Sequence, residues 1–185
     1  MPEKEHRIVN GWYEGALREP SPNFDERPAG QVVDLLVIHA ISLPPDEFGG
    51  GYIQRFFQNK LDPSIHPYFE QISSMEVSAH FLIERSGNLV QFVATDKRAW
   101  HCGESHFCGR DRCNDFAIGI ELEGCDSKPF RDSQYARLGE LTTAIRSAHP
   151  AIATENIVGH MDIAPNRKTD PGPYFDWTRY RERLV

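Results

Sequence analysis

The stretch Val32-Val33-Asp34-Leu35-Leu36-Val37-Ile38-His39 decides the fold of this chain of 185 residues. The run up to Ile38 is almost wholly apolar and rich in β-branched side chains, a pattern typical of a strand buried inside a sheet. His39 ends the run, and the loop that follows contains Pro44, Pro45 and three consecutive glycines. The sequence therefore predicts a central strand that carries a histidine at its carboxyl end.

Strand patterns recur further along the chain. Residues 79–84 and 89–93 flank Arg85-Ser86-Gly87-Asn88, and turn residues between two such segments predict a β-hairpin. The apolar run over residues 116–122 predicts another strand.

Helix patterns lie between and after these strands. A short helix is expected over residues 52–58, and Asp132 is expected to cap a helix over residues 133–148. A terminal helix is expected to begin near Asp176 and to bury three side chains, those of Trp177, Tyr180 and Leu184.

Two segments, residues 61–74 and 159–174, show neither the helical nor the strand spacing of apolar residues and are expected to be loops. Strands interleaved with helices predict an α/β protein with a single central mixed sheet flanked by helices.

The composition is that of an ordinary globular protein, with 39% hydrophobic and 25% charged residues. A net charge of −7 and a pI near 5.6 disfavour a nucleic-acid-binding protein, which needs a basic face. No segment approaches the roughly 18 apolar residues of a membrane span, and residues 1–20 lack the apolar core of a signal peptide. We therefore expect a cytoplasmic protein that binds neither nucleic acid nor membrane.

Four cysteines lie close together in the sequence, namely Cys102, Cys108, Cys113 and Cys125. They contain no Cys-x-x-Cys pair, which disfavours a structural zinc knuckle. Without an export signal reduced thiols are expected, and a disulfide is the alternative that the sequence leaves open.

Three places carry side chains suited to hydrolytic chemistry. His39 lies where a rigid strand can hold a functional group at the end of a sheet. Glu121 follows an apolar run and shares one strand face with Glu123, because alternate residues point the same way. A proline-rich loop over residues 159–173 offers four polar side chains, those of His160, Asp162, Lys168 and Asp170.

Each place also has a purely structural explanation: a hydrogen-bonded histidine, a glutamate paired with arginine, and a polar surface loop. A zinc site needs about three protein ligands and an open position, which His39, His160 and one aspartate would supply. Burial would raise the pKa of Glu121 towards the neutral range that a general base requires. A thermolysin-like site is not indicated, because the sequence has no His-Glu-x-x-His motif.

These places belong to a longer series of motifs that follow one another between about residue 11 and residue 180. The series is Leu36-Val37-Ile38-His39, His66-Pro67-Tyr68-Phe69, Val77-Ser78-Ala79-His80, Arg98-Ala99-Trp100-His101, Cys113-Asn114-Asp115-Phe116, residues 118–124, Gly159-His160, and Lys168-Thr169-Asp170-Pro171-Gly172. With this series the sequence resembles the type-2 N-acetylmuramoyl-L-alanine amidase family, and within it the cytosolic enzymes for anhydro-muramyl peptides. The resemblance implies the fold of peptidoglycan recognition proteins and a single amidase domain over residues 1–185, with a core of about 11–180.

The resemblance also implies roles for individual residues. The implied ligands of Zn²⁺ are His39, His160 and Asp170. The implied catalytic residues are Glu121 as general base, Lys168 beside the scissile carbonyl, and Tyr68 in support. The implied substrate contacts are Arg112, Trp100 and His101.

The implied reaction is hydrolysis of the amide between the lactyl group of anhydro-N-acetylmuramic acid and L-alanine, during cell-wall recycling. Zinc and Glu121 would activate water, and zinc and Lys168 would stabilise the oxyanion. The expected partner is the small anhydro-muropeptide, with no obligate protein partner.

Four positions depart from the family pattern without falling on an implied ligand, namely Ala40, Glu76, Cys102 and Met161. Three other readings are a non-catalytic binding module of the same fold, an exported amidase for intact murein, and a phage-type lytic amidase. The filled ligand positions disfavour the first. The lack of a signal peptide disfavours the second, and the lack of a basic wall-binding region disfavours the third.

Overall fold

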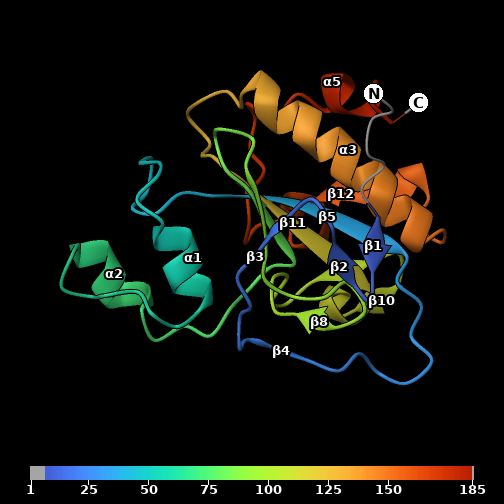
Figure 1. Ribbon diagram of the computed structural model, residues 1–185, viewed down its shortest axis with the longest axis horizontal. Coiled ribbons are helices and arrows are strands. Elements are labelled where there is room, and N and C mark those ends of the chain that lie inside the picture. The colour runs from blue at the N-terminus through green and yellow to red at the C-terminus, as the bar shows by residue number, and fades with distance from the viewer. Residues whose placement is uncertain (1–6, 185) are drawn as a thin grey trace.

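The computed structural model describes residues 7–184, and a six-stranded mixed sheet lies at its centre (Figure 1). The order across the sheet is β12 (Ile157–Gly159), β5 (Leu35–Ile41), β11 (Ala117–Glu123), β6 (Phe81–Ile83), β7 (Leu89–Gln91) and β3 (Leu17–Arg18). Strands β12, β5, β11 and β6 are parallel neighbours, whereas β6 and β7 form the predicted antiparallel hairpin. The predicted α/β class with one central mixed sheet is confirmed.

Strand β5 is the central strand that the apolar run predicted, and it extends past His39 to Ile41. Its side chains alternate between two cores: Leu36 and Ile38 pack in one hydrophobic cluster, and Leu35 and Val37 pack in another. His39 continues the face of Leu35 and Val37, so its imidazole points to the side of the sheet opposite to Leu36 and Ile38.

Helix α3 (Asp132–Ala148) and helix α5 (Trp177–Arg181) lie together over the face of Leu36 and Ile38 (Figure 1). Helix α5 begins next to Asp176, as predicted, and Asp176 caps it, since its carboxylate accepts a hydrogen bond from the backbone N–H of Arg179 at 2.9 Å. Of the three side chains expected to be buried there, Tyr180 is fully buried, and Trp177 and Leu184 are partly buried.

The expected cap of α3 is wrong by one position. The helix begins at Asp132 itself, and Arg131 is the N-cap residue. The side chain of Gln134 accepts a hydrogen bond from the backbone N–H of Arg131 at 3.0 Å, which satisfies a donor at the helix start without the aspartate.

Two helices occur where loops were expected. Residues 61–74 contain α2 (Pro67–Ile72), which follows α1 (Tyr52–Phe57), and residues 159–174 contain the single turn α4 (His160–Ile163). Helix α2 is too short to show a period, and it forms because His66 Nδ1 accepts a hydrogen bond from the N–H of Tyr68. Pro67 occupies its first position, where a missing N–H costs nothing.

The remaining elements are short. Three antiparallel pairs are β1 (Ile8–Val9) with β2 (Trp12–Tyr13), β4 (Phe24–Asp25) with β8 (Arg98–Ala99), and β9 (His106–Phe107) with β10 (Arg110–Asp111). Residues Cys113–Asp115 and Thr154–Asn156 form single 3₁₀ turns. All four cysteines are free thiols, as expected. Among residues 7–184, no helix is long and apolar enough to cross a membrane.

A buried hydrogen bond between Thr142 and Tyr180 joins α3 to α5, with 2.6 Å between the two hydroxyl oxygens. Tyr180→Phe should lower the free energy of unfolding by about 1–3 kcal/mol, because the Thr142 hydroxyl is left buried without this partner. Urea denaturation of Tyr180→Phe, Thr142→Val and the double variant measures the coupling. The double variant should lose less than the sum of the single variants, and strict additivity would contradict the prediction.

Candidate active site

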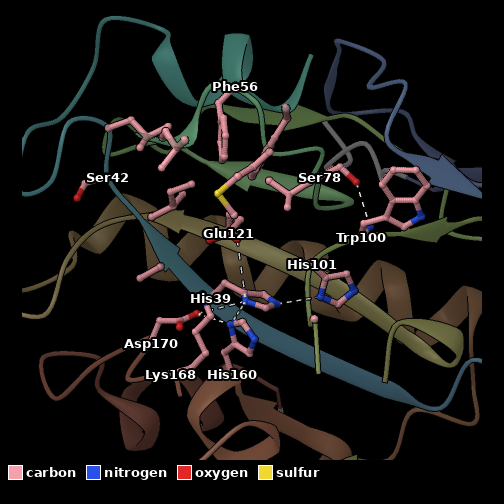
Figure 2. A pocket seen from close by; sticks show the side chains of 18 of the residues that line it. His39, Ser42, Phe56, Ser78, Trp100, His101, Glu121, His160, Lys168 and Asp170 are labelled. Carbon is pink, nitrogen blue, oxygen red and sulfur yellow. Dashed lines mark hydrogen bonds and ion pairs between the residues drawn. The ribbon is translucent and has the colours of Figure 1, made fainter. Parts of the chain in front are cut away.

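Three neighbouring parallel strands deliver the predicted site residues to one end of the sheet. His39 in β5 pairs in register with Glu121 in β11, and His160 directly follows β12 on the other side of β5. Parallel strands end at the same edge of a sheet, so the loops that follow them bring functional groups together there. Figure 2 shows His39, His160 and Asp170 pointing towards one another, with Glu121 directed at the same place.

Three atoms from these side chains form a compact triangle. His39 Nδ1 lies 3.0 Å from His160 Nδ1, and Asp170 Oδ2 lies 3.2 Å from the first nitrogen and 3.1 Å from the second. A tetrahedral zinc ion with bonds of about 2.0–2.1 Å holds its ligand atoms roughly 3.3 Å apart. The triangle therefore has the size that zinc requires.

The protonation of the histidines also suits a metal ion. His160 Nε2 lies 3.0 Å from the carbonyl oxygen of Cys102, which can only accept a hydrogen bond. With a metal bound, Nε2 of a neutral His160 would therefore carry the proton, and Nδ1 would turn a lone pair towards the centre of the triangle. Burial raises the pKa of Asp170, but hydrogen bonds and charge interactions with His160 and His39 lower it below its usual value overall, so Asp170 is a carboxylate. Lone pairs and negative charge converge on one point, which is the chemistry of a cation site.

A second group of possible metal ligands, His39, His101 and Cys102, involves the other ring nitrogen of His39, Nε2. His39 Nε2 lies 2.9 Å from His101 Nδ1, and the thiol of Cys102 lies 3.2 Å from that same nitrogen. A hydrogen bond between the two imidazoles accounts for this approach. Burial raises the pKa of Cys102 well above its usual value, so the thiolate that a metal needs is disfavoured. The triangle with Asp170 is the better metal site.

Glu121 is buried and unusually poor in partners. Its Oε1 lies 4.0 Å from His39 Nδ1, and its Oε2 has no hydrogen-bond partner among residues 7–184. Burial raises its pKa well above the usual value, the carboxylate of Asp170 raises it further, and Lys168 lowers it. A carboxyl group held in this way readily takes up a proton.

Glu123 lies two residues further along β11 but belongs to a structural network. Its carboxylate accepts hydrogen bonds from the backbone N–H groups of Gly49 at 2.5 Å and Arg85 at 2.9 Å. These bonds tie two loops to the end of the sheet. Glu123 therefore has a structural role, although through backbone N–H groups and not through the arginine pairing that the sequence left open.

A cleft of about 700 Å³ opens above the triangle, between the sheet and the segment that carries α1 and α2. Of the six predicted catalytic and substrate-contacting residues, five line it: Glu121, Lys168, Tyr68, Trp100 and His101. Arg112 is not among the lining residues. Its guanidinium is exposed and pairs with Asp115 at 2.6 Å.

Two loop residues have structural tasks that the sequence did not reveal. Asp162 accepts a hydrogen bond from the N–H of Gly159 at 2.7 Å, which starts the turn that presents His160. Arg167 donates to the carbonyl oxygens of Cys102 and Glu104. The Asp162 contact is local and the Arg167 contacts reach a segment distant in sequence. Neither belongs to a sequence motif.

Comparison with known proteins agrees with this geometry. The family described as N-acetylmuramoyl-L-alanine amidase matches residues 29–173. The chain is 61% identical over 160 residues to 1,6-anhydro-N-acetylmuramyl-L-alanine amidase AmpD of Haemophilus influenzae, covering 86% of this chain and 87% of that protein. AmpD of Escherichia coli is 55% identical over 174 residues, covering 94% of each.

Solved structures give the same result. A crystal structure of selenomethionine AmpD matches with a TM-score of 0.93 and 52% identity, covering 96% of this chain and 99% of that one. AmiD of Escherichia coli, solved with anhydro-N-acetylmuramic acid-L-Ala-D-gamma-Glu-L-Lys, matches with a TM-score of 0.63 and 27% identity, covering 88% and 66%.

These relatives are amidases, and they identify the chain as a hydrolase. The chain belongs to the N-acetylmuramoyl-L-alanine amidase family, as its motifs predicted.

The metal-free protein should lose stability on mild acidification. Burial lowers the pKa of His39 from 6.5 to about 4. Between these values the unfolded chain binds a proton at this position that the folded chain does not. The free energy of unfolding therefore falls as the pH drops through that window. Burial lowers the pKa of His80 and His101 as well, which acts in the same direction, whereas the raised pKa of Glu121 acts in the opposite direction and offsets part of the loss.

Urea denaturation of metal-free protein at several pH values within this window measures the slope. His39→Gln should show a shallower slope than the wild type, because one of the titrating groups is gone. Equal slopes in the two proteins would contradict the assignment to His39.

Proposed function

We propose that the chain is a zinc-dependent amidase of cell-wall recycling in the cytoplasm. It hydrolyses the amide between the lactyl group of anhydro-N-acetylmuramic acid and L-alanine in soluble muropeptides. One observation carries the proposal: three metal-binding atoms converge beside the buried carboxyl group of Glu121, whose Oε2 has no hydrogen-bond partner among residues 7–184. Relatives with more than half of their residues identical bear the name of this activity, and AmiD was solved with such a substrate.

His39, His160 and Asp170 would hold the zinc ion. Bound zinc would supply Lewis-acid chemistry, since it lowers the pKa of water and polarises a carbonyl oxygen. Two neutral imidazoles and one carboxylate leave the ion a net positive charge. The side of the triangle that faces the cleft is open to the substrate.

Glu121 is proposed as the general base. The 4.0 Å between its Oε1 and His39 Nδ1 is too long for a direct hydrogen bond and leaves the carboxylate facing the place where water attacks. Burial holds its pKa high, and a positive charge in the triangle would lower it towards neutrality. Glu121 then takes the proton of the attacking water and passes it to the leaving amine.

Lys168 is proposed to stabilise the oxyanion. It lines the cleft near Glu121, and Asp170, two residues away, fixes its loop beside the triangle. A cation held here faces the oxygen on which negative charge develops. Tyr68 would support the same carbonyl from α2, across the cleft.

Trp100 and His101 are proposed to contact the substrate from the wall of the cleft. Arg112 would act from outside the cleft lining, where its exposed guanidinium can reach an anionic part of a long substrate. The cleft is closed on one side by α1 and α2, which favours a small soluble muropeptide over a cross-linked polymer.

Zinc removal and a choice of substrates test the proposal together. The purified protein should hold one zinc ion per chain, and a chelator should abolish release of the tripeptide from anhydro-muramyl-tripeptide. Added zinc should restore the release, followed by chromatography of the products, and intact sacculi should remain uncut. Full activity in a preparation shown by elemental analysis to be metal-free would refute the proposal.

Glu121→Gln tests the general base. The variant should keep its zinc and lose turnover by about a hundred- to ten-thousand-fold, because glutamine cannot accept the proton. Glu123→Gln is the matched control on the same strand face. It should lose stability, since Glu123 accepts two backbone hydrogen bonds, and should keep most of its turnover. Equal losses of turnover in the two zinc-loaded variants would remove Glu121 from this role.

A further inference from the structure

The outer nitrogens of both histidine ligands meet partners in one dipeptide. His39 Nε2 lies 2.9 Å from Nδ1 of His101, and His160 Nε2 lies 3.0 Å from the carbonyl oxygen of Cys102. His39 and His160 come from different elements, 121 residues apart. A single local feature, the His101–Cys102 dipeptide, thus contacts both of them, and Figure 2 shows His101 on the side of His39 away from Asp170.

These contacts decide which nitrogen of each imidazole faces the triangle. A histidine binds a metal through an unprotonated nitrogen, and the hydrogen bond made by its other nitrogen fixes that tautomer and the plane of the ring. The Cys102 carbonyl can only accept, so it requires a proton on His160 Nε2. His101 Nδ1 does the same for His39 when it accepts the proton of His39 Nε2.

The dipeptide is itself held by one side chain, that of Asn114. Its Oδ1 accepts hydrogen bonds from the N–H of His101 at 3.1 Å and from the N–H of Cys102 at 2.8 Å. The backbone of Asn114 is fixed in turn, because its carbonyl oxygen accepts from the guanidinium of Arg27 at 2.9 Å. No other side chain between residues 7 and 184 bonds both N–H groups of this dipeptide.

The imidazole of His101 has little freedom to move away. It packs against the backbone of β11 at Gly119, where an added Cβ would come within 2.4 Å of its Nδ1. Asn114 fixes the backbone of His101 and Gly119 leaves the space for its ring. The position of the acceptor atom is therefore determined by two contacts that lie outside the ligand triangle.

We propose that Asn114 is a positioning residue of the metal centre. Through the His101–Cys102 dipeptide, it holds both histidine ligands in the tautomer and orientation that present Nδ1 to the metal. This inference rests on the proposed zinc site and extends it, since Asn114 neither contacts the triangle nor belongs to the ligands. Loss of its Oδ1 would loosen both histidines at once.

The experiment compares Asn114→Leu with Asn114→Asp in the full chain. Leucine has a similar shape and no acceptor, whereas aspartate keeps an oxygen at the position of Oδ1. Competition with a chromophoric chelator should show zinc bound about ten- to a hundred-fold more weakly by Asn114→Leu. Asn114→Asp should bind zinc much more tightly than Asn114→Leu does.

A spectroscopic measurement separates positioning from general stability. In the zinc-loaded wild type, the Nε2–H groups of His39 and His160 should give slowly exchanging signals in NMR spectra of ¹⁵N-histidine-labelled protein. Both signals should weaken together in Asn114→Leu. The control is Asn156→Leu: this asparagine is also half-buried, and its side chain bonds the carbonyl of Asp34 instead. Asn156→Leu should keep the zinc affinity and both signals.

A second pair of variants covers the case in which Asn114→Leu does not fold. His101→Asn places an oxygen near the position of Nδ1, and His101→Leu removes the acceptor, so only the leucine variant should bind zinc weakly and lose the His39 signal. Wild-type zinc affinity in Asn114→Leu, or in His101→Leu, would overturn this inference and leave the proposed function intact. A wild-type protein that binds no zinc would instead overturn the proposed function itself.

Discussion

The structure depends above all on the parallel pairing of β5 with β11. In this register His39 lies opposite Glu121, so a proposed zinc ligand and the proposed base are neighbours on adjacent strands. A shift of β5 by one residue against β11 would turn His39 away from Glu121, to the face of the sheet where Leu36 and Ile38 now pack. The apolar residues on either side of His39 therefore fix the register and, with it, the place of the chemistry.

Burial at this point has a cost that the protein chain alone does not offset. His39, His160 and Glu121 are almost fully buried, and Asp170 is a carboxylate beside them. Arg98 pairs with both Asp25 and Asp115, but among residues 7–184 no arginine forms an ion pair with Asp170 or Glu121. Lys168 supplies positive charge only from the exposed side.

The sequence predicted the fold where patterns are long and regular. β5, the β6–β7 hairpin and α3 follow from apolar runs, turn residues and helical spacing. It failed at α2 and α4, because six and four residues hold less than two helical turns and no period can show. It also misplaced the cap of α3, since Asp132 looked like a cap residue while Gln134 satisfied the donor of Arg131 from within the helix.

The candidate site shows a similar division. Strand ends and a proline-rich loop drew attention to His39, Glu121 and residues 159–173, but the choice of Asp170 over Asp162 came from the family resemblance. Only the structure shows why: Asp162 bonds the N–H of Gly159, and Asp170 faces the two imidazoles. Glu121 and Glu123 likewise differ because only Glu123 accepts hydrogen bonds from the backbone of Gly49 and Arg85. No local sequence pattern predicts these long-range contacts.

The departure from the family pattern at Cys102 illustrates how such a site tolerates change. The contact that matters to His160 is made by the carbonyl oxygen of residue 102, which every amino acid carries. The side chain of Cys102 is fully buried, so only a small side chain fits there. A cysteine meets this requirement because it behaves as a small apolar residue. Because the backbone of residue 102 makes the contact, only the size of its side chain is constrained. The residues that hold this backbone by hydrogen bonds, Asn114 and Arg167, are constrained in their chemistry.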